Sequence, residues 1–202
     1  MAGHFSDCAA TGLRRLGGVF LSAEYLVRYC SPTLAGIKIG SLFSCRYEDV
    51  MDLLDFVETQ EALLAPKGVH MVLVKMCNGF ALIYVYRLQQ LEQILASPRI
   101  RAFLRQYGYT RFDVEHCLAL LKKRLMDDDF PHEIGIFLGY PLDDVQAFIV
   151  NKGANCPCVG TWKAYTNIVE AQRIFRSYKK CTQIYCQRFF EGMDIARLTV
   201  AG

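Results

Sequence analysis

The fold class is decided by one stretch of the sequence, Val69-His70-Met71-Val72-Leu73-Val74-Lys75-Met76-Cys77-Asn78-Gly79-Phe80-Ala81-Leu82-Ile83-Tyr84-Val85-Tyr86. Two apolar runs flank Asn78-Gly79, a dipeptide that tolerates the positive φ angles of a type I′ turn. The stretch therefore predicts a β-hairpin with a two-residue loop. In that register, one face of the hairpin pairs Val74 with Ile83 and Val72 with Val85, and the other face carries Leu73 and Tyr84 with Met71 and Tyr86.

Both faces of this hairpin are apolar, so the sheet needs cover on both sides. Outside the hairpin, the apolar spacing predicts helices over 20–29, 46–63, 88–96, 98–106, 111–126, 142–151 and 167–191, and strands over 37–43 and 160–165. The long C-terminal helix is marked by Asn167 as its N-cap and by Gly192 after its end. We therefore expect an α+β fold, with a small, mostly antiparallel sheet around the 69–86 hairpin, in a single domain over 19–202 after a loose lead-in, 1–18.

Composition excludes several classes of protein. The chain has 202 residues, of which 52% are hydrophobic and 21% charged, unlike a disordered or fibrous chain. Its longest stretch without a charge, Met76 to Tyr86, is shorter than the roughly 18 to 20 apolar residues of a membrane span. The net charge of +3 does not favour non-specific nucleic-acid binding, and the glycine-rich phosphate motifs are missing. We expect no membrane and no nucleic acid among its partners.

The cysteines indicate the compartment. There are nine, an odd number, and Glu24 interrupts the only stretch that resembles a signal peptide. We therefore expect a cytoplasmic protein with free thiols, most of them buried as small apolar side chains.

Three separated blocks carry a resemblance to a known family. They are Cys30-Ser31-Pro32-Thr33-Leu34-Ala35-Gly36-Ile37-Lys38, then Phe130-Pro131-His132-Glu133-Ile134-Gly135-Ile136-Phe137-Leu138-Gly139-Tyr140-Pro141 with Asp144-Val145 and Phe148-Ile149, and Gly160-Thr161-Trp162-Lys163-Ala164-Tyr165. In this order they resemble the bacterial "domain of unknown function 3793" family, from about Tyr25 to the end of the long helix. The resemblance implies no assigned activity, and it implies flavodoxin-like proteins as partners. The chain departs from the family pattern at Ala154-Asn155-Cys156-Pro157-Cys158, so these two cysteines are not expected to serve a shared function.

A Cys/His enzyme is one hypothesis for the chemistry. Cys30 would be the nucleophile and His132 the base, with Glu133 or one of the aspartates 127–129 orienting the imidazole of an acyl-transfer enzyme or hydrolase. Cys30 follows the predicted helix 20–29, where the negative end of the helix dipole disfavours a thiolate. Cys30 is equally interpreted as a buried turn residue, and His132 as a proton carrier, a ligand or a cap.

Metal binding is a weaker hypothesis, so no metal is predicted and no cofactor is named. Cys156-Pro157-Cys158 could donate two thiolates to a metal or a haem, but no second ligand pair follows.

A binding protein is the preferred hypothesis. The three blocks combine aromatic side chains with a few polar groups, as a mostly apolar pocket requires. The predicted ligand-binding residues are Thr33, Lys38, Tyr140, Trp162, Lys163 and Tyr165. Ordinary core packing is the alternative interpretation of the same aromatic residues.

The long C-terminal helix also carries a basic face, formed by Arg173, Arg176, Lys179 and Lys180. Such a face is either a solvated helix surface or a docking surface for an acidic protein such as a flavodoxin. The sequence leaves both interpretations open.

Overall fold

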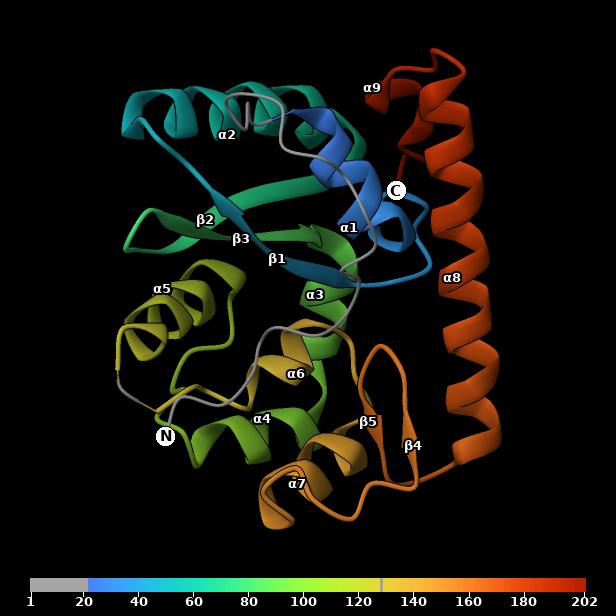
Figure 1. The fold of residues 1–202 in the computed structure, drawn as a ribbon. Helices are drawn as coiled ribbons and strands as arrows, with labels where there is room; N and C mark the ends of the chain where they lie inside the picture. Colours follow the sequence, from blue (N-terminus) through green and yellow to red (C-terminus); the bar gives the residue numbers. More distant parts are fainter. Residues whose placement is uncertain (1–21, 128) are drawn as a thin grey trace.

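The centre of the protein is a three-stranded antiparallel sheet in the order β1-β3-β2 (Figure 1). The computed structural model describes residues 22–127 and 129–202, so the lead-in predicted over 1–18 lies outside the described residues. β1 is Gly40–Arg46, β2 is Val69–Cys77 and β3 is Phe80–Arg87. Asn78 and Gly79 join β2 to β3 with φ angles of 52° and 75°, which confirms the predicted hairpin and its two-residue turn.

The predicted register of the hairpin is correct only near the turn. Cys77 pairs with Phe80, but a β-bulge between Leu73 and Lys75 shifts every later pair, so that Leu73 lies opposite Ile83. The predicted pairs of Val74 with Ile83 and Val72 with Val85 are therefore wrong. The bulge turns Val74, which is 2% exposed, into the core on the Tyr84 side of the sheet.

Helices cover both faces of the sheet, as its two apolar faces require (Figure 1). One face packs against α1 (Ala23–Leu34), α2 (Val50–Leu64) and, at the end of the chain, α9 (Ile195–Leu198). The other face packs against α3 (Leu88–Ala96), α4 (Pro98–Arg105), α5 (Val114–Leu125) and α6 (Ile134–Phe137). The helices predicted over 46–63, 88–96, 98–106 and 111–126 are thereby confirmed within a few residues at each end.

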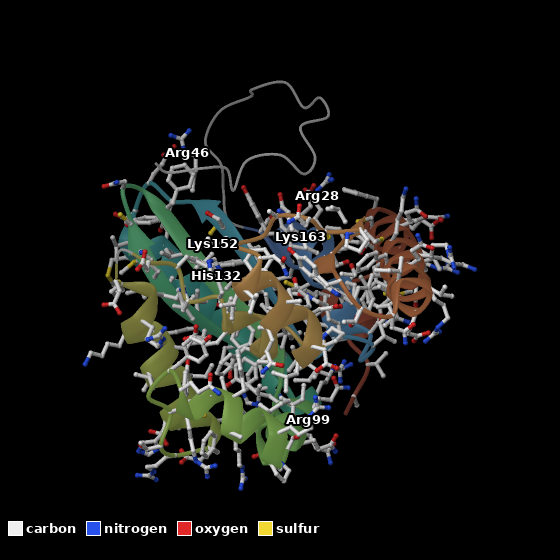
Figure 2. The ribbon with its side chains drawn as sticks, turned by 90° about the horizontal axis from the view of Figure 1, so that it is seen from below. Arg28, Arg46, Arg99, His132, Lys152 and Lys163 are labelled. Carbon is white, nitrogen blue, oxygen red and sulfur yellow. The ribbon has the colours of Figure 1, made fainter. Side chains whose placement is uncertain are left out.

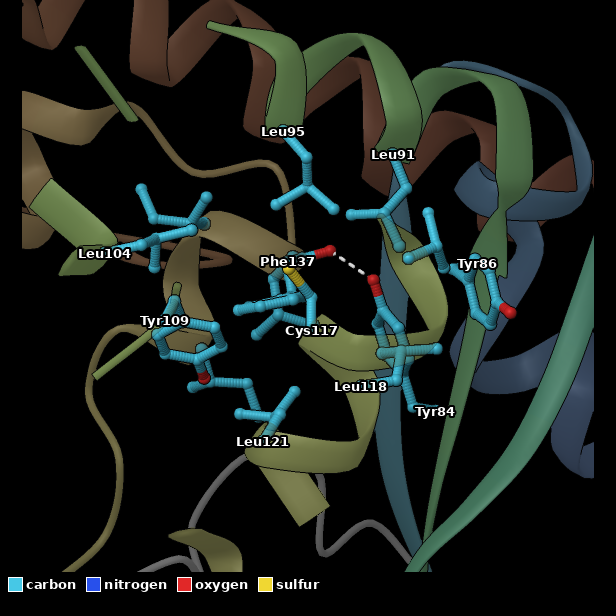
Figure 3. Close-up of a cluster of buried hydrophobic side chains, with 14 of the residues drawn as sticks. Tyr84, Tyr86, Leu91, Leu95, Leu104, Tyr109, Cys117, Leu118, Leu121 and Phe137 are labelled. Carbon is cyan, nitrogen blue, oxygen red and sulfur yellow. Dashed lines mark hydrogen bonds between the residues drawn. The ribbon is translucent and has the colours of Figure 1, made fainter. Parts of the chain in front are cut away.

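The core between the sheet and α3, α4, α5 and α6 contains a buried polar contact (Figure 3). The Tyr84 hydroxyl donates a hydrogen bond of 2.6 Å to the carbonyl oxygen of Phe137, so this buried phenol is satisfied. Gly40 lies against the same ring, since a Cβ atom there would stand 2.6 Å from the Tyr84 ring. The approach of β1 to α6 therefore requires a residue without a side chain.

The segment before β1 differs from the sequence prediction. The helix predicted over 20–29 is α1, which begins at Ala23 and continues through Cys30 and Pro32 to Leu34. The strand predicted over 37–43 begins only at Gly40. Cys30 therefore lies inside a helix rather than in the turn that follows one.

Arg87, at the end of β3, stabilises the end of α1. Its buried guanidinium donates hydrogen bonds to the carbonyl oxygens of Thr33 at 2.7 Å, Leu34 at 2.5 Å and Val200 at 2.8 Å. Two of these carbonyls belong to the last turn of α1, where the negative end of the helix dipole favours a cation. This one side chain connects the sheet, α1 and the segment around Val200.

The remaining elements lie beyond the sheet. They are the 3₁₀ turn Ala65–Lys67, α7 (Leu142–Val150), β4 (Cys158–Val159), β5 (Lys163–Ala164) and α8 (Ile168–Phe190). The strand predicted over 160–165 is only two residues long and pairs with β4 in a separate ribbon, so it adds nothing to the main sheet. α7 and α8 confirm the helices predicted over 142–151 and 167–191, and the Asn167 side chain accepts a hydrogen bond from the Glu170 backbone as an N-cap.

Over residues 22–127 and 129–202, no helix is both long and apolar enough to cross a bilayer.

Candidate functional site

A cavity of about 490 Å³ lies between the α6–α7 segment and the β4–β5 ribbon. Most of its wall is apolar and is formed by Leu42, Ile134, Leu138, Val145, Phe148 and Trp162. The other lining residues include Asp144 and the polar or aromatic residues Tyr140, His132, Thr161 and Lys163. We call this the aromatic cavity. It unites two of the three blocks named above, 130–141 and 160–165, which are separated in sequence by residues 142–159.

Asp144 fixes the ribbon against α7. Its side chain is 2% exposed, and its Oδ2 atom accepts a hydrogen bond of 2.7 Å from the indole Nε1–H of Trp162. Its Oδ1 atom accepts three more, from the backbone N–H groups of Tyr165 at 2.9 Å and Thr166 at 2.7 Å and from the Thr166 hydroxyl at 2.8 Å. Four donors thus satisfy one buried carboxylate, which sets the position of the Trp162 ring.

Trp162 stands in a group of aromatic rings. It stacks on Tyr140 at a centroid distance of 5.2 Å, and the edge of Phe175 from α8 meets it at 4.5 Å. Gly160 makes this packing possible, because a Cβ atom there would lie only 2.1 Å from the Phe175 ring. The Tyr140 hydroxyl donates to the carbonyl oxygen of Thr161 at 3.1 Å, which closes the stack on the ribbon.

Asp144 is buried in the wall of the aromatic cavity, whereas His132 and Lys163 lie at its exposed rim. His132 is exposed, and its ring meets the Phe148 ring edge-on at 5.0 Å. Lys163 donates a hydrogen bond of 2.8 Å to the Gly153 carbonyl, and its ammonium lies 5.8 Å from the centre of the same Phe148 ring. Figure 2 shows His132, Lys163 and Lys152 on the same side of the molecule. The rim therefore concentrates groups that attract an anion around an apolar interior.

Lys38, from the first block, contacts the wall without lining the cavity. It is 8% exposed, and its ammonium lies 5.5 Å from the centre of the Tyr140 ring. Burial lowers the pKa of Lys38 to about 8, although the nearby Cys30 thiol acts in the opposite direction. Lys38 is the part of the first block that approaches the other two.

Cys30 and Thr33 lie deeper, in the core between α1 and the sheet. Burial raises the pKa of the Cys30 thiol to about 12, against the smaller opposite effects of Lys38 and the Ser41 hydroxyl. Thr33 shares a hydrogen bond of 2.9 Å with Ser41. His132 lines the aromatic cavity and Cys30 does not, so the structure does not place the two groups of the Cys/His hypothesis in one cavity.

Glu133 is directed toward α5. It is 1% exposed, and its Oε1 atom is bound by the Arg124 guanidinium and by the Tyr109 hydroxyl at 3.5 Å. Of the aspartates considered as alternatives to Glu133, 127 and 129 are exposed, and 128 lies outside the described residues. Glu133 thus stabilises the α5 contact rather than the His132 ring.

Tyr165 lies beside the cavity, with its hydroxyl donating to the Ala154 carbonyl at 2.9 Å. The predicted ligand-binding set missed Leu42 altogether, and it left out Asp144, Val145 and Phe148, which belong to the second family-like block. Asp144 carried a signal, since it is a charged residue directly before Val145 on the apolar side of the helix predicted over 142–151. A carboxylate at such a position needs buried donors.

The cysteines of the ribbon make local contacts. The Cys156 thiol donates to the carbonyl oxygens of Cys158 at 2.8 Å and Ala164 at 3.4 Å. Within residues 22–127 and 129–202, no group of three metal-ligating side chains comes together, and the eight cysteines there are free thiols.

The basic residues of α8 lie on its exposed side. Arg173 forms an ion pair of 2.6 Å with Glu170 on the same helix. In the part of the chain that the structure describes, Arg176, Lys179 and Lys180 form no ion pair.

Fold and site together define an α+β protein in which a small ribbon, packed against the long C-terminal helix through Trp162 and Phe175, forms one side of an aromatic cavity. Residues 26–199 match the family described as "Protein of unknown function (DUF3793)", so the chain belongs to this family and the resemblance seen in the sequence is confirmed. No curated protein and no solved structure matches the chain.

Proposed function

We propose that the protein binds a small ligand in the aromatic cavity, and that this ligand has an apolar body and one acidic group. The observation that carries the proposal is the division of the cavity into apolar walls and a rim that bears Lys163 and His132. A volume of about 490 Å³ is in the range of small-molecule sites, which combine apolar walls with a few orienting polar groups.

The acidic group is argued from the chemistry of the rim. Among the residues that the structure describes, Lys163 donates one hydrogen bond, to the Gly153 carbonyl, and an ammonium has three donors. Asp144, the one carboxylate among the described residues that line the cavity, already accepts four hydrogen bonds, so its oxygens are occupied by donors of the protein itself. Charge at this site therefore favours an anion.

A Cys/His hydrolase remains the alternative, and the geometry supports it less. The Cys30 thiol is fully buried outside the cavity, and its raised pKa opposes formation of the thiolate that would attack a substrate. Docking of an acidic protein on α8 and a cytoplasmic location also remain predictions.

The test uses Trp162, the only tryptophan of the chain, as its reporter. A ligand in the aromatic cavity contacts its ring, so titration with arylalkyl and alkyl carboxylates should change tryptophan fluorescence in a saturable way. Each acid, such as phenylbutyrate, is compared with its alcohol, such as phenylbutanol. We expect the acids to bind more tightly than the alcohols.

A pair of lysine variants provides the control. Lys163→Gln keeps a donor for Gly153 but loses the charge, so it should weaken acid binding about threefold to fivefold, as expected for one exposed ion pair, and leave the alcohols unchanged. Lys179→Gln, on the exposed side of α8, should change neither. If no member of the panel gives saturable quenching, or if both variants behave alike, the proposed function is wrong.

A further inference from the structure

α2 presents an acidic stripe to solvent. Its outermost positions are Met51, Asp55, Glu58 and Ala62, all exposed and separated by four, three and four residues, and Asp52 lies directly beside them. None of these three acidic side chains forms an ion pair with a residue that the structure describes. The opposite side of α2 is occupied, since Leu53, Phe56 and Leu64 are buried against the sheet.

α8 presents a basic stripe with the same spacing. Its outermost positions are Val169, Arg173, Arg176 and Lys180, all exposed and again separated by four, three and four residues. At 1.5 Å per residue, each stripe is about 16 Å long. We call the two sets the acidic stripe of α2 and the basic stripe of α8.

The two stripes are complementary when the helices lie antiparallel. Asp55 then meets Arg176, and Asp52 comes within reach of Lys180. Glu58 meets Arg173, which also forms an ion pair with Glu170 of its own helix. The small apolar ends also meet, Ala62 against Val169. In a parallel arrangement the pair at Asp52 is lost, so the charges favour the antiparallel one.

One molecule cannot make these pairs by itself. Figure 1 shows α2 along one side of the sheet and α8 along another, with α1 between them. From this complementarity we propose that the protein associates with a second copy of itself, the acidic stripe of α2 in one copy docking on the basic stripe of α8 in the other. This inference concerns a different surface from the aromatic cavity and does not depend on the proposed ligand.

Contacts between exposed charges are weakened by salt, and an interface of two helix stripes is small. The association should therefore be weak and salt-sensitive. It closes as a dimer where a two-fold axis pairs both stripes of each copy, and it otherwise continues as a chain. Sedimentation velocity at low ionic strength, over concentrations from micromolar to millimolar, should show the mass rising above the 23.0 kDa of one chain. At high ionic strength the association should be at least about tenfold weaker.

Charge reversal gives the decisive experiment. One variant carries Arg173→Glu, Arg176→Glu and Lys180→Glu, and the other carries Asp52→Lys, Asp55→Lys and Glu58→Lys. Each variant alone has two stripes of the same sign and should remain a monomer, whereas an equimolar mixture should form a heterodimer. All six positions are exposed, and circular dichroism of each variant checks that the fold is kept.

Three results overturn the inference. The first is a wild-type protein that stays monomeric at low ionic strength. This result counts against the inference even if the basic stripe of α8 then binds an added acidic protein such as a flavodoxin. The second is a mixture of the two variants that does not associate. Association of the α8 variant alone would likewise assign the dimer to another surface.

Discussion

Replacing Asp144 by asparagine tests the structural basis of the aromatic cavity. The change keeps the size of the side chain, and it replaces one acceptor oxygen by an NH₂ group that can only donate. With the amide nitrogen toward Trp162, the indole N–H loses its acceptor, and with the opposite orientation three donors lose theirs. Neither orientation restores the contacts of the carboxylate.

The expected cost follows from these contacts. A hydrogen bond to a charged group contributes about 1.5–3 kcal/mol, a neutral one about 0.5–1.5 kcal/mol, and a buried donor without a partner costs about 1–3 kcal/mol. One orphaned N–H and three weakened bonds, which are not additive, give a loss of about 2–4 kcal/mol in the free energy of unfolding. The ribbon should also lose its fixed position, so Asp144→Asn should bind the carboxylate probes more weakly than the wild type.

Urea unfolding, followed in parallel by Trp162 fluorescence and far-ultraviolet circular dichroism, measures this loss. Asp143→Asn is the matched control, because Asp143 is the next residue, is 57% exposed and forms only a surface ion pair of 3.0 Å with Arg99. Its effect should stay within about 0.5 kcal/mol. If Asp144→Asn also stays within that limit, the four contacts do not stabilise the fold and the reasoning fails.

Three further predictions concern other parts of the structure. Gly160→Ala should lower the free energy of unfolding by about 1–3 kcal/mol in urea melts because its Cβ would overlap the Phe175 ring, and an unchanged midpoint would contradict that packing. Lys38→Met should be more stable than the wild type near neutral pH, by about 3 kcal/mol, because the buried ammonium has its pKa lowered to about 8 from an ordinary 10.5. Between pH 8 and pH 10.5 the unfolded wild-type chain binds more protons than the folded one, so the free energy of unfolding of the wild type should rise with pH relative to that of Lys38→Met. The prediction is contradicted if the two proteins show the same dependence of stability on pH. In native protein near pH 8 a thiol reagent should label the exposed Cys77 and leave Cys30 unlabelled, and rapid labelling of Cys30 would revive the Cys/His hypothesis.

The sequence predicted those features that short segments determine by themselves. The Asn78-Gly79 turn needs only two residues with positive φ, and Asn167 and Gly192 mark the ends of α8 through local capping. The sequence therefore defined the hairpin, most helices and the fold class without reference to distant contacts.

The errors arose where a distant residue determines the local structure. Pro32 predicted a turn, yet α1 continues past it because Arg87, more than fifty residues away, binds the carbonyls of its last turn. The bulge at Val74 likewise depends on the core beneath it, and Lys75 then reaches the Leu125 carbonyl at the end of α5 at 2.5 Å. The sequence around Pro32 and around Val74 contains no pattern that predicts either contact.

The candidate site shows the same division. Tyr140, Trp162 and Lys163 were predicted to lie together from their blocks, and they line one cavity. Leu42, which completes the wall from β1, could not be identified, because only the sheet and the bend after α1 bring it to α6 and α7. The spacing of residues along the chain does not predict that β1 packs beside α6 and α7.

The three carbonyl contacts of Arg87 also constrain when the protein can finish folding during synthesis. β3 and α1 are synthesised early, but the Arg87 guanidinium lacks one of its three carbonyl acceptors until Val200, more than one hundred residues later, has been synthesised. Val200 in turn donates its N–H to the Leu34 carbonyl at 3.0 Å, so both groups close the same junction. A nascent chain halted before this point would hold a partly desolvated charge with incomplete partners, and such a product would be an early substrate for chaperones and proteases.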